Sequence, residues 1–174
     1  MQKVVFLDRD GVINVEKNYL HTIEEFEFID GVFESLQYLQ NLGYKLVIIT
    51  NQSGIGRGYY TQEQYELLTQ WMKKEFEKKK ISISGVFCCP HSPDDLCDCR
   101  KPKIGMIEQT AQIMDIDYAN SWLIGDKNSD ILTAYNANIP NTIQVQSGHD
   151  FNKSESKATY VVNSIKDIAT IIKS

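Results

Sequence analysis

Carboxylate side chains follow two apolar segments of the sequence at the points where those segments end. Asp8 and Asp10 come directly after the run at residues 4–7, and Asp126 follows a second run, with Asp130 four residues further on. Several acids at the ends of buried strands are costly unless a cation meets them there. Oxygen ligands in a site with open coordination positions suit Mg²⁺. These acids therefore predict a magnesium site, provided that the fold brings the two segments together.

A hydroxyl group ends a third apolar segment. Thr50 follows the run at residues 46–49, and the polar stretch 51–54 comes after it. A hydroxyl and the backbone N–H groups behind it are suited to bind phosphate oxygens. Lys101, or Lys103 just after it, can supply a compensating positive charge. We therefore expect a phosphate-binding site beside the metal.

The elements that must position these groups alternate between strands and helices. The sequence predicts strands at residues 4–7, 44–50, 83–88, 122–124, 142–145 and 160–162. It predicts helices at residues 32–42, 61–79, 105–114 and 130–138 and after Ser164, the second opened by a capping box at Thr61 and Gln64. This alternation is typical of an α/β fold, a parallel sheet with helices on both faces. Ligands bind such sheets at the carboxyl ends of the strands, where the acids lie.

Length, composition and charge limit the function classes. The 174 residues fit one domain, 1–174, with a mobile surface loop expected at 147–158. A net charge of −5 argues against a protein that coats nucleic acid. No apolar run is as long as a membrane span, and Met1 runs into the first strand without room for a signal peptide. We therefore expect a cytoplasmic protein with no nucleic-acid partner and no membrane partner.

The cysteines are clustered at residues 88–99, which excludes a disulfide framework spread over the fold. The pattern Cys-x-His-x5-Cys-x-Cys offers three thiolates and one imidazole, a closed tetrahedral set typical of structural zinc. The ligands would be Cys89, His91, Cys97 and Cys99, in a zinc loop at 88–103, with Cys88 as a core residue of the strand. A reduced cysteine cluster without metal is the alternative. Zinc would fix the loop that presents Arg100 and Lys101.

Four segments occur in the order of a known set of motifs. They are Asp8-Arg9-Asp10-Gly11-Val12, then Thr50, then Lys101, then Gly125-Asp126 with Asp130. This pattern resembles the haloacid dehalogenase superfamily of phosphatases. The resemblance implies Asp8 as the nucleophile, Asp10 as general acid and then general base, and Thr50 and Lys101 as groups that stabilise the phosphate. It also implies catalytic Mg²⁺ held by Asp8, Asp126 and the main-chain oxygen of Asp10.

Longer segments narrow the resemblance to one family. They are Cys-Pro-His at 89–91 with Cys-Asp-Cys-Arg-Lys-Pro at 97–102, Thr-Asn-Gln-Ser-Gly-Ile-x-Arg-Gly at 50–58, and Gly-Asp-Lys at 125–127. Over residues 4–146 the chain is similar to the heptose bisphosphate phosphatases, which have a Rossmann-like core without a cap domain. The resemblance implies a monomeric, Mg²⁺-dependent enzyme that removes the 7-phosphate of D-glycero-D-manno-heptose 1,7-bisphosphate. It implies a place in nucleotide-activated heptose biosynthesis, which supplies lipopolysaccharide and other surface glycans.

The same resemblance implies the residues that bind the substrate. Residues 50–53 would hold the phosphate, Arg100 the distal end of the sugar, and residues 16–19 would form the substrate loop. The implied substrate-binding residues are Asp8, Asp10, Glu16, Lys17, Asn18, Tyr19, Thr50, Asn51, Gln52, Ser53, Arg100, Lys101 and Lys127. Asn18 stands where the family more often has glycine, but Asn tolerates the left-handed conformation. The insert between His91 and Cys97 is short relative to many relatives, which leaves the anomer preference open.

Parts of the sequence also suit three alternative functions. A histidinol-phosphate phosphatase shares the motifs, and Glu16 would then contact the substrate ammonium. A non-catalytic zinc-binding domain is disfavoured because the motifs at Asp8 and Asp126 are intact. A nucleic-acid end phosphatase is disfavoured by the acidic balance and by the lack of aromatic residues interleaved with basic ones. His21 and His149 are expected at the surface, and Arg57 receives no role.

Overall fold

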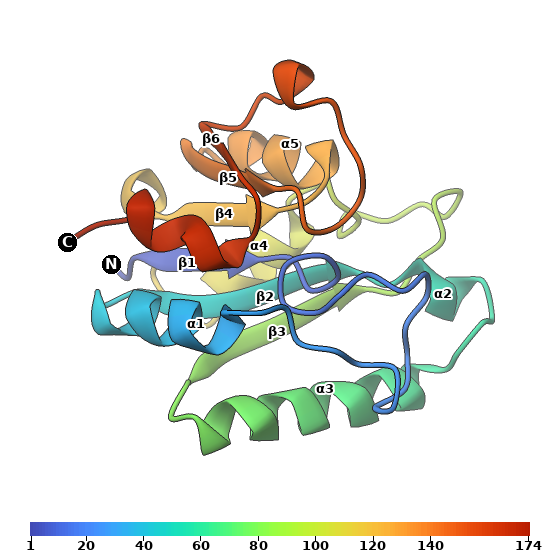
Figure 1. Cartoon of the computed structure of the whole chain (residues 1–174). Helices are drawn as coiled ribbons and strands as arrows, with labels where there is room; N and C mark the ends of the chain where they lie inside the picture. Colours follow the sequence, from blue (N-terminus) through green and yellow to red (C-terminus); the bar gives the residue numbers. More distant parts are fainter.

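A parallel sheet organises the fold, which the computed structural model describes for all residues from 1 to 174 (Figure 1). The strands lie in the order β3-β2-β1-β4-β5-β6, and every neighbouring pair is parallel. They are β1 (Val4–Leu7), β2 (Lys45–Asn51), β3 (Ile83–Cys89), β4 (Trp122–Gly125), β5 (Asn141–Val145) and β6 (Tyr160–Val162). Each predicted strand is confirmed, with both ends within one residue of the prediction.

Helices cover both faces of this sheet, as the alternation of elements predicts (Figure 1). Helices α1 and α3 and the 3₁₀ helix η3 pack on one face, whereas α4 and α5 pack on the other. The helices are α1 (Val32–Asn41), α2 (Ser53–Gly56), α3 (Gln62–Lys78), α4 (Gly105–Ala111), α5 (Asn128–Asn136), η1 (Tyr118–Asn120), η2 (Lys153–Glu155) and η3 (Ile165–Thr170). No helix is both long enough and apolar enough to cross a membrane.

Successive residues of the central strands fill two separate hydrophobic clusters. In β1, Val5 and Leu7 belong to the cluster beneath α1, α3 and η3, whereas Val4 and Phe6 belong to the cluster beneath α4. All of these side chains are completely buried. Burial on both faces explains why this strand is a continuous apolar run rather than an alternating one.

The sheet order changes direction between β1 and β4. Strands β2 and β3 lie beyond β1, and strands β5 and β6 lie beyond β4. The loops that follow β1 and β4 therefore run in opposite directions from the carboxyl ends of these two strands. The crevice between such loops is the usual ligand site of parallel sheets. Asp8 and Asp126 begin these two loops, and the Asp8 N–H donates to the Ile124 carbonyl at 3.0 Å. The topology thus brings the two acidic segments together, as the magnesium hypothesis requires.

Several helical segments differ from the prediction: η1 and η2 were not predicted, and α4 ends at Ala111, three residues earlier than predicted. Helix α2 was not predicted because its sequence, Ser-Gly-Ile-Gly, contains two glycines, which disfavour helix. Helix α5 begins two residues earlier than predicted because Asp130 caps it, accepting from the Lys127 N–H at 3.1 Å. The segment after Ser164 is a 3₁₀ helix, whose buried residues Ile165 and Ile168 suit a repeat of three.

One further expectation needs correction. Cys88 is half-buried rather than part of the core, because β3 is an edge strand of the sheet. The loop at 147–158 has no buried residue, as expected for a surface loop, and Ser147 Oγ donates to the Gly11 carbonyl at 2.7 Å. The beginning of this loop therefore packs against the loop that follows β1. Its mobility and the single-domain organisation stay predictions.

Substitution of Phe76 in α3 tests the packing of this core and the single-domain prediction. Phe76 is completely buried, so Phe76→Ala should lower the free energy of unfolding by about 3–5 kcal/mol. Leu67→Ala on the exposed face of the same helix should change it by less than about 0.5 kcal/mol. Denaturant unfolding followed by circular dichroism and by tryptophan fluorescence should give one coincident transition. Two separate transitions would contradict a single domain.

Candidate active site

A cavity of about 350 Å³ lies at the carboxyl ends of β1, β2 and β4. Most of the residues predicted to bind substrate line it. These are Asp8, Asp10, Glu16, Asn18, Tyr19, Asn51, Gln52, Ser53, Arg100, Lys101 and Lys127. Thr50 and Asp126 do not line the cavity. Both are completely buried, and each directly precedes a cavity-lining residue in the sequence. The fold therefore gathers residues from loops far apart in the chain around one cavity.

Three carboxylates converge at the ends of β1 and β4. Asp8, Asp126 and Asp130 each offer an oxygen, and these oxygens lie within 4.8 Å of one another. Lys101 reaches two of them: its Nζ lies 2.9 Å from Asp8 Oδ1 and 2.6 Å from Asp130 Oδ1. Asp126, Asp130 and Lys101 are all nearly completely buried. Lys101 rather than Lys103 is thus the compensating charge.

A single lysine leaves the three acids undercompensated. Burial raises the pKa of Asp8 well above its usual value. The carboxylates of Asp130, Asp126 and Asp10 raise this pKa further, whereas the charge of Lys101 lowers it. Asp126 Oδ1 is buried and has no hydrogen-bond partner. A divalent cation would satisfy that oxygen and stabilise the ionised form of Asp8. The residues present therefore fit Mg²⁺.

The backbone of Lys101 is tied to the end of β2. The Lys101 N–H donates to Asn51 Oδ1 at 3.0 Å, and Asn51 Nδ2 donates back to the Lys101 carbonyl at 3.4 Å. Lys101 Nζ also donates to the Ile49 carbonyl at 3.0 Å. Burial opposes the charge of Lys101, but Asp130 and Asp8 outweigh burial and raise its pKa. The Asn51 side chain, predicted to bind substrate, is thus engaged in holding a charged lysine.

Asp10 is held by a hydrogen-bond network. Arg9 Nη2 and Asn14 Nδ2 each donate to its Oδ1 at 3.0 Å, and Gln52 Nε2 donates to its Oδ2 at 2.9 Å. Gln52 in turn accepts from the Tyr60 hydroxyl through its Oε1. Burial raises the pKa of Asp10, but Arg9 and these hydrogen bonds outweigh burial and lower the pKa. Asp10 is therefore ionised and fixed in orientation, and the Gln52 side chain is occupied in fixing it.

Thr50 and Ser53 flank Gln52 at the end of β2. Thr50 is completely buried, and its Oγ1 accepts from Gln52 Nε2 at 2.8 Å. This bond uses a lone pair of the Thr50 hydroxyl and leaves its hydrogen free to donate. Ser53 is the first residue of α2 and lines the cavity. The role of Thr50 and Ser53 in binding phosphate stays a prediction.

The predicted substrate loop has an unusual backbone conformation. Asn18 (φ 46°) and Tyr19 (φ 61°) are both left-handed, so Asn18 adopts the conformation that glycine favours. The Asn18 N–H donates to Glu16 Oε1 at 2.8 Å, which fixes this turn. The Tyr19 ring packs edge-on against Tyr59, with ring centroids 4.7 Å apart. Consecutive residues in sparsely populated conformations are typical of ligand-binding segments.

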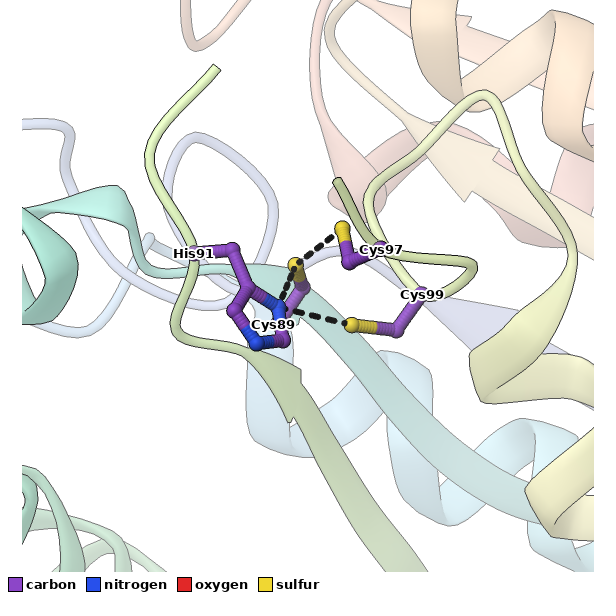
Figure 2. A group of neighbouring side chains, drawn as sticks. All are labelled: Cys89, His91, Cys97 and Cys99. Atoms are coloured by element: carbon purple, nitrogen blue, oxygen red, sulfur yellow. Dashed lines mark hydrogen bonds between the residues drawn. The ribbon is translucent and has the colours of Figure 1, made fainter. Parts of the chain in front are cut away.

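The predicted zinc ligands lie together at the end of β3 and in the loop after it (Figure 2). Ligand atoms of Cys89, His91, Cys97 and Cys99 are all within 4.8 Å of one another. His91 Nδ1 lies 3.4 Å from Cys89 Sγ and 3.2 Å from Cys99 Sγ, so this ring nitrogen faces the thiols. Burial raises the pKa of Cys89, so its thiolate form needs a cation nearby. The donor set and its closed arrangement fit Zn²⁺.

The zinc loop is docked against the segment that follows β2. The Gly56 N–H donates to the Pro90 carbonyl at 2.8 Å, and a Cβ atom on Gly56 would lie 2.8 Å from that oxygen. The Gln52 N–H donates to the Cys89 carbonyl at 2.8 Å. These close backbone contacts hold the loop in place, so that Arg100 and Lys101, which follow its last ligand, reach the cavity.

Several cavity residues were missed at the level of sequence, and one predicted residue lies elsewhere. The missed residues include Arg57, Tyr60, Ser129 and His149. His149 is partly exposed, as expected, with 41% of its side chain accessible, but its Nδ1 also lies 2.6 Å from Asp126 Oδ2, a contact that was not predicted. His149 follows β5, the neighbour of β4, so its position after a strand was the available signal. Lys17 is absent from the cavity wall, because its Nζ pairs with Glu27 Oε2 at 3.2 Å.

The chain is similar to known phosphatases in sequence and in structure. A family model for polynucleotide kinase 3 phosphatase matches residues 3–165. The D-glycero-beta-D-manno-heptose-1,7-bisphosphate 7-phosphatase of Pasteurella multocida (strain Pm70) is 42% identical over 180 residues, covering 99% of this chain and 98% of the relative. The D-glycero-alpha-D-manno-heptose-1,7-bisphosphate 7-phosphatase of Photorhabdus laumondii is 49% identical over 154 residues, or 84% of each chain. The solved structure of D,D-heptose 1.7-bisphosphate phosphatase from B. bronchiseptica, complexed with magnesium and phosphate, has a TM-score of 0.84 at 28% identity and covers 97% of each chain.

Removal of the buried lysine tests the charge balance of the carboxylate cluster. Lys101→Met leaves Asp8 and Asp130 without their cation, so it should lower the free energy of unfolding by about 3–5 kcal/mol in Mg²⁺-free buffer. Added Mg²⁺ should recover part of this loss because it supplies positive charge to the same acids. Chemical denaturation with and without Mg²⁺ measures both effects.

The matched control for this variant is Lys103→Met, two residues further along the same loop. Lys103 is exposed and forms no ion pair, and its Nζ donates only to the Cys97 carbonyl, so its loss should cost less than about 1 kcal/mol and should not depend on Mg²⁺. Equal losses in the two variants would contradict the role given to Lys101.

Proposed function

The chain belongs to the heptose bisphosphate phosphatases of the haloacid dehalogenase superfamily and to the polynucleotide kinase 3 phosphatase family, and on this premise we propose that it hydrolyses D-glycero-D-manno-heptose 1,7-bisphosphate. It removes the 7-phosphate with the help of Mg²⁺ and thereby serves nucleotide-activated heptose biosynthesis. The observation that carries this proposal is the cluster of Asp8, Asp126, Asp130 and Lys101 beside a cavity with spare positive charge.

The spare positive charge comes from three side chains on the cavity wall. Arg57, Arg100 and Lys127 line the cavity, and no side-chain nitrogen of these three residues lies within 4.0 Å of a carboxylate oxygen. Arg100 Nη1 is also buried without a hydrogen-bond partner. The reacting phosphate has Lys101 and the metal to stabilise it, so these additional cations suit a second phosphate at the other end of the substrate. A bisphosphate can therefore pair with cations at both ends of the cavity, whereas a monophosphate can pair with them at only one end.

The first step is attack by Asp8 on the phosphorus of the 7-phosphate. A bond forms between an Asp8 carboxylate oxygen and phosphorus, the bond from phosphorus to the sugar oxygen breaks, and Asp10 gives its proton to the departing oxygen. The phosphate dianion near Asp10 favours that protonated form, which counters the lowered pKa of Asp10 in the free protein. The product of this step is an aspartyl phosphate on Asp8 and the sugar with a free 7-hydroxyl.

The second step returns Asp8 to its starting state. Asp10, now a carboxylate, takes a proton from a water molecule whose oxygen attacks the phosphorus, and the bond to Asp8 breaks to release inorganic phosphate. Thr50 and Lys101 donate hydrogen bonds to the phosphate oxygens in both steps. Asp8, Asp126 and the main-chain oxygen of Asp10 would hold Mg²⁺, which neutralises phosphate charge and orients the phosphate when bound.

The histidinol-phosphate alternative is not favoured. It requires an acidic contact to the substrate ammonium, and Glu16 was the candidate for it. The Glu16 carboxylate instead accepts from the Asn18 N–H at 2.8 Å and holds the turn of its own loop. Three unpaired cations on the wall would also repel an ammonium group.

Two finer parts of the proposal concern the metal and the setting of the enzyme. We infer that the Cys89, His91, Cys97 and Cys99 cluster holds a structural Zn²⁺, supported by its closed set of four ligands. We also infer a monomer that works in the cytoplasm, as expected from the resemblance to small phosphatases without a cap domain. Size-exclusion chromatography with light scattering would test the monomer.

Phosphate release from a panel of substrates tests the proposed reaction. With Mg²⁺, the preferred heptose 1,7-bisphosphate anomer should exceed histidinol phosphate and an aryl phosphate by at least about 100-fold in kcat/KM, because only it engages both ends of the cavity. Asp8→Asn should lower kcat by more than about 100-fold, equivalent to about 3 kcal/mol, because the nucleophile is lost.

The matched control is Asp115→Asn, which changes an exposed acid that pairs only with the chain N-terminus and should keep full activity. A preference for histidinol phosphate would overturn the substrate assignment. Wild-type turnover by Asp8→Asn would overturn the mechanism.

Loss of one zinc ligand tests the structural role of that metal. Cys97→Ser should reduce the zinc content and lower the melting temperature by more than about 5 °C, since about 2–4 °C correspond to 1 kcal/mol in a chain of this size. Cys88→Ser, which changes the neighbouring cysteine outside the cluster, should keep one zinc per chain. Elemental analysis and thermal denaturation measure the two quantities. A Cys97→Ser protein that lost zinc and activity with an unchanged melting temperature would show that the zinc is not structural.

A further inference from the structure

The two oxygens of the Asp126 carboxylate have different surroundings. Oδ1 is buried without a hydrogen-bond partner, so it is free to bind a cation. Oδ2 accepts two hydrogen bonds from the same residue, from the His149 main-chain N–H at 2.7 Å and from His149 Nδ1 at 2.6 Å. Because Asp126 is completely buried, its orientation is set by these contacts and not by water.

Two glycines that lie next to each other also approach Oδ2 closely. A Cβ atom on Gly148 would lie 2.2 Å from Asp126 Oδ2, and a Cβ atom on Gly11 would lie 2.6 Å from it. The two glycine segments are joined, because Ser147 Oγ donates to the Gly11 carbonyl at 2.7 Å. Residues 147–149 and Gly11 thus pack closely against Oδ2, whereas Oδ1 has no hydrogen-bond partner.

His149 is the only side chain that donates to this carboxylate, and it also reaches the substrate cavity. Its side chain is 41% exposed and lines the cavity together with Lys127 and Asp130. The donated bonds do not require a charged ring, because a neutral imidazole protonated at Nδ1 donates equally well. Partners of this kind, which bind a metal ligand on its far side, commonly fix how that ligand meets the metal.

We infer that His149 is a positioning residue for the metal ligand Asp126, holding Oδ2 so that only Oδ1 is presented to Mg²⁺. The inference rests on the proposed function only in treating the carboxylate cluster as the Mg²⁺ site. It does not depend on which sugar phosphate the enzyme hydrolyses.

Mg²⁺ binding without substrate tests this role. Isothermal titration calorimetry of the zinc-loaded protein should show Mg²⁺ binding about 10-fold weaker in His149→Ala than in wild type, the lower end of the effect of such partners. His149→Asn should stay within about threefold of wild type, because the asparagine amide nitrogen is as many bonds from the backbone as Nδ1 is. Lys153→Ala, an exposed change in the same loop, should bind Mg²⁺ as wild type does and keep wild-type activity.

The melting temperature of the Mg²⁺-free variants separates positioning from folding. If His149→Ala lowered this temperature but bound Mg²⁺ within twofold of wild type, the positioning role would be overturned. Equal loss of Mg²⁺ affinity in His149→Asn and His149→Ala would also overturn it. Failure of the heptose substrate alone would instead overturn only the proposed function, because the titration contains no substrate.

Discussion

The structure depends on one electrostatic constraint, the burial of Asp8, Asp126 and Asp130 within 4.8 Å of one another. Such acids repel one another at any pH at which they ionise, and burial removes the water that would screen them. Lys101 offsets part of this charge and leaves a site for a divalent cation. The same imbalance that makes the cluster costly without a metal makes it able to bind one. In the proposed mechanism, this cation allows a dianionic phosphate to approach the Asp8 carboxylate.

Much of the remaining architecture serves to keep this cluster and its lysine in register. The parallel order β3-β2-β1-β4-β5-β6 sets the ends of β1 and β4 side by side, so that residues far apart in sequence meet. The loop that carries the proposed zinc ligands is docked on Gly56 through the Pro90 carbonyl and leads directly into Lys101. Asn51 holds the backbone of that lysine through two hydrogen bonds. The Cys/His cluster and the carboxylate cluster are therefore mechanically connected through this loop.

The sequence predicted the elements and motifs well, because these depend on local patterns. Continuous apolar runs located the strands, and the acids that follow two of those runs indicated a metal site. The sequence did not predict which side chains of the site face the substrate and which face the protein. Asn51 and Gln52 were expected to bind substrate; both line the cavity, and their side chains also hydrogen-bond to Lys101 and Asp10, whereas Lys17 pairs with Glu27 away from the cavity wall. His149 was expected at the surface because a lone histidine in a polar loop has no periodic signal, and its contact with Asp126 exists only through the crossing of two loops.

The proposed aspartyl-phosphate mechanism is tested most directly by identifying the residue that carries the phosphate during turnover. Acyl phosphates are reduced by borohydride to the corresponding alcohol, which would convert a phosphorylated aspartate into homoserine. The enzyme should be quenched during turnover of heptose bisphosphate with Mg²⁺, reduced, digested and analysed by mass spectrometry. The mechanism predicts that Asp8 is converted into homoserine and that no other aspartate is. Homoserine at position 10, 126 or 130, or no reduction at any aspartate while phosphate is released, would contradict it.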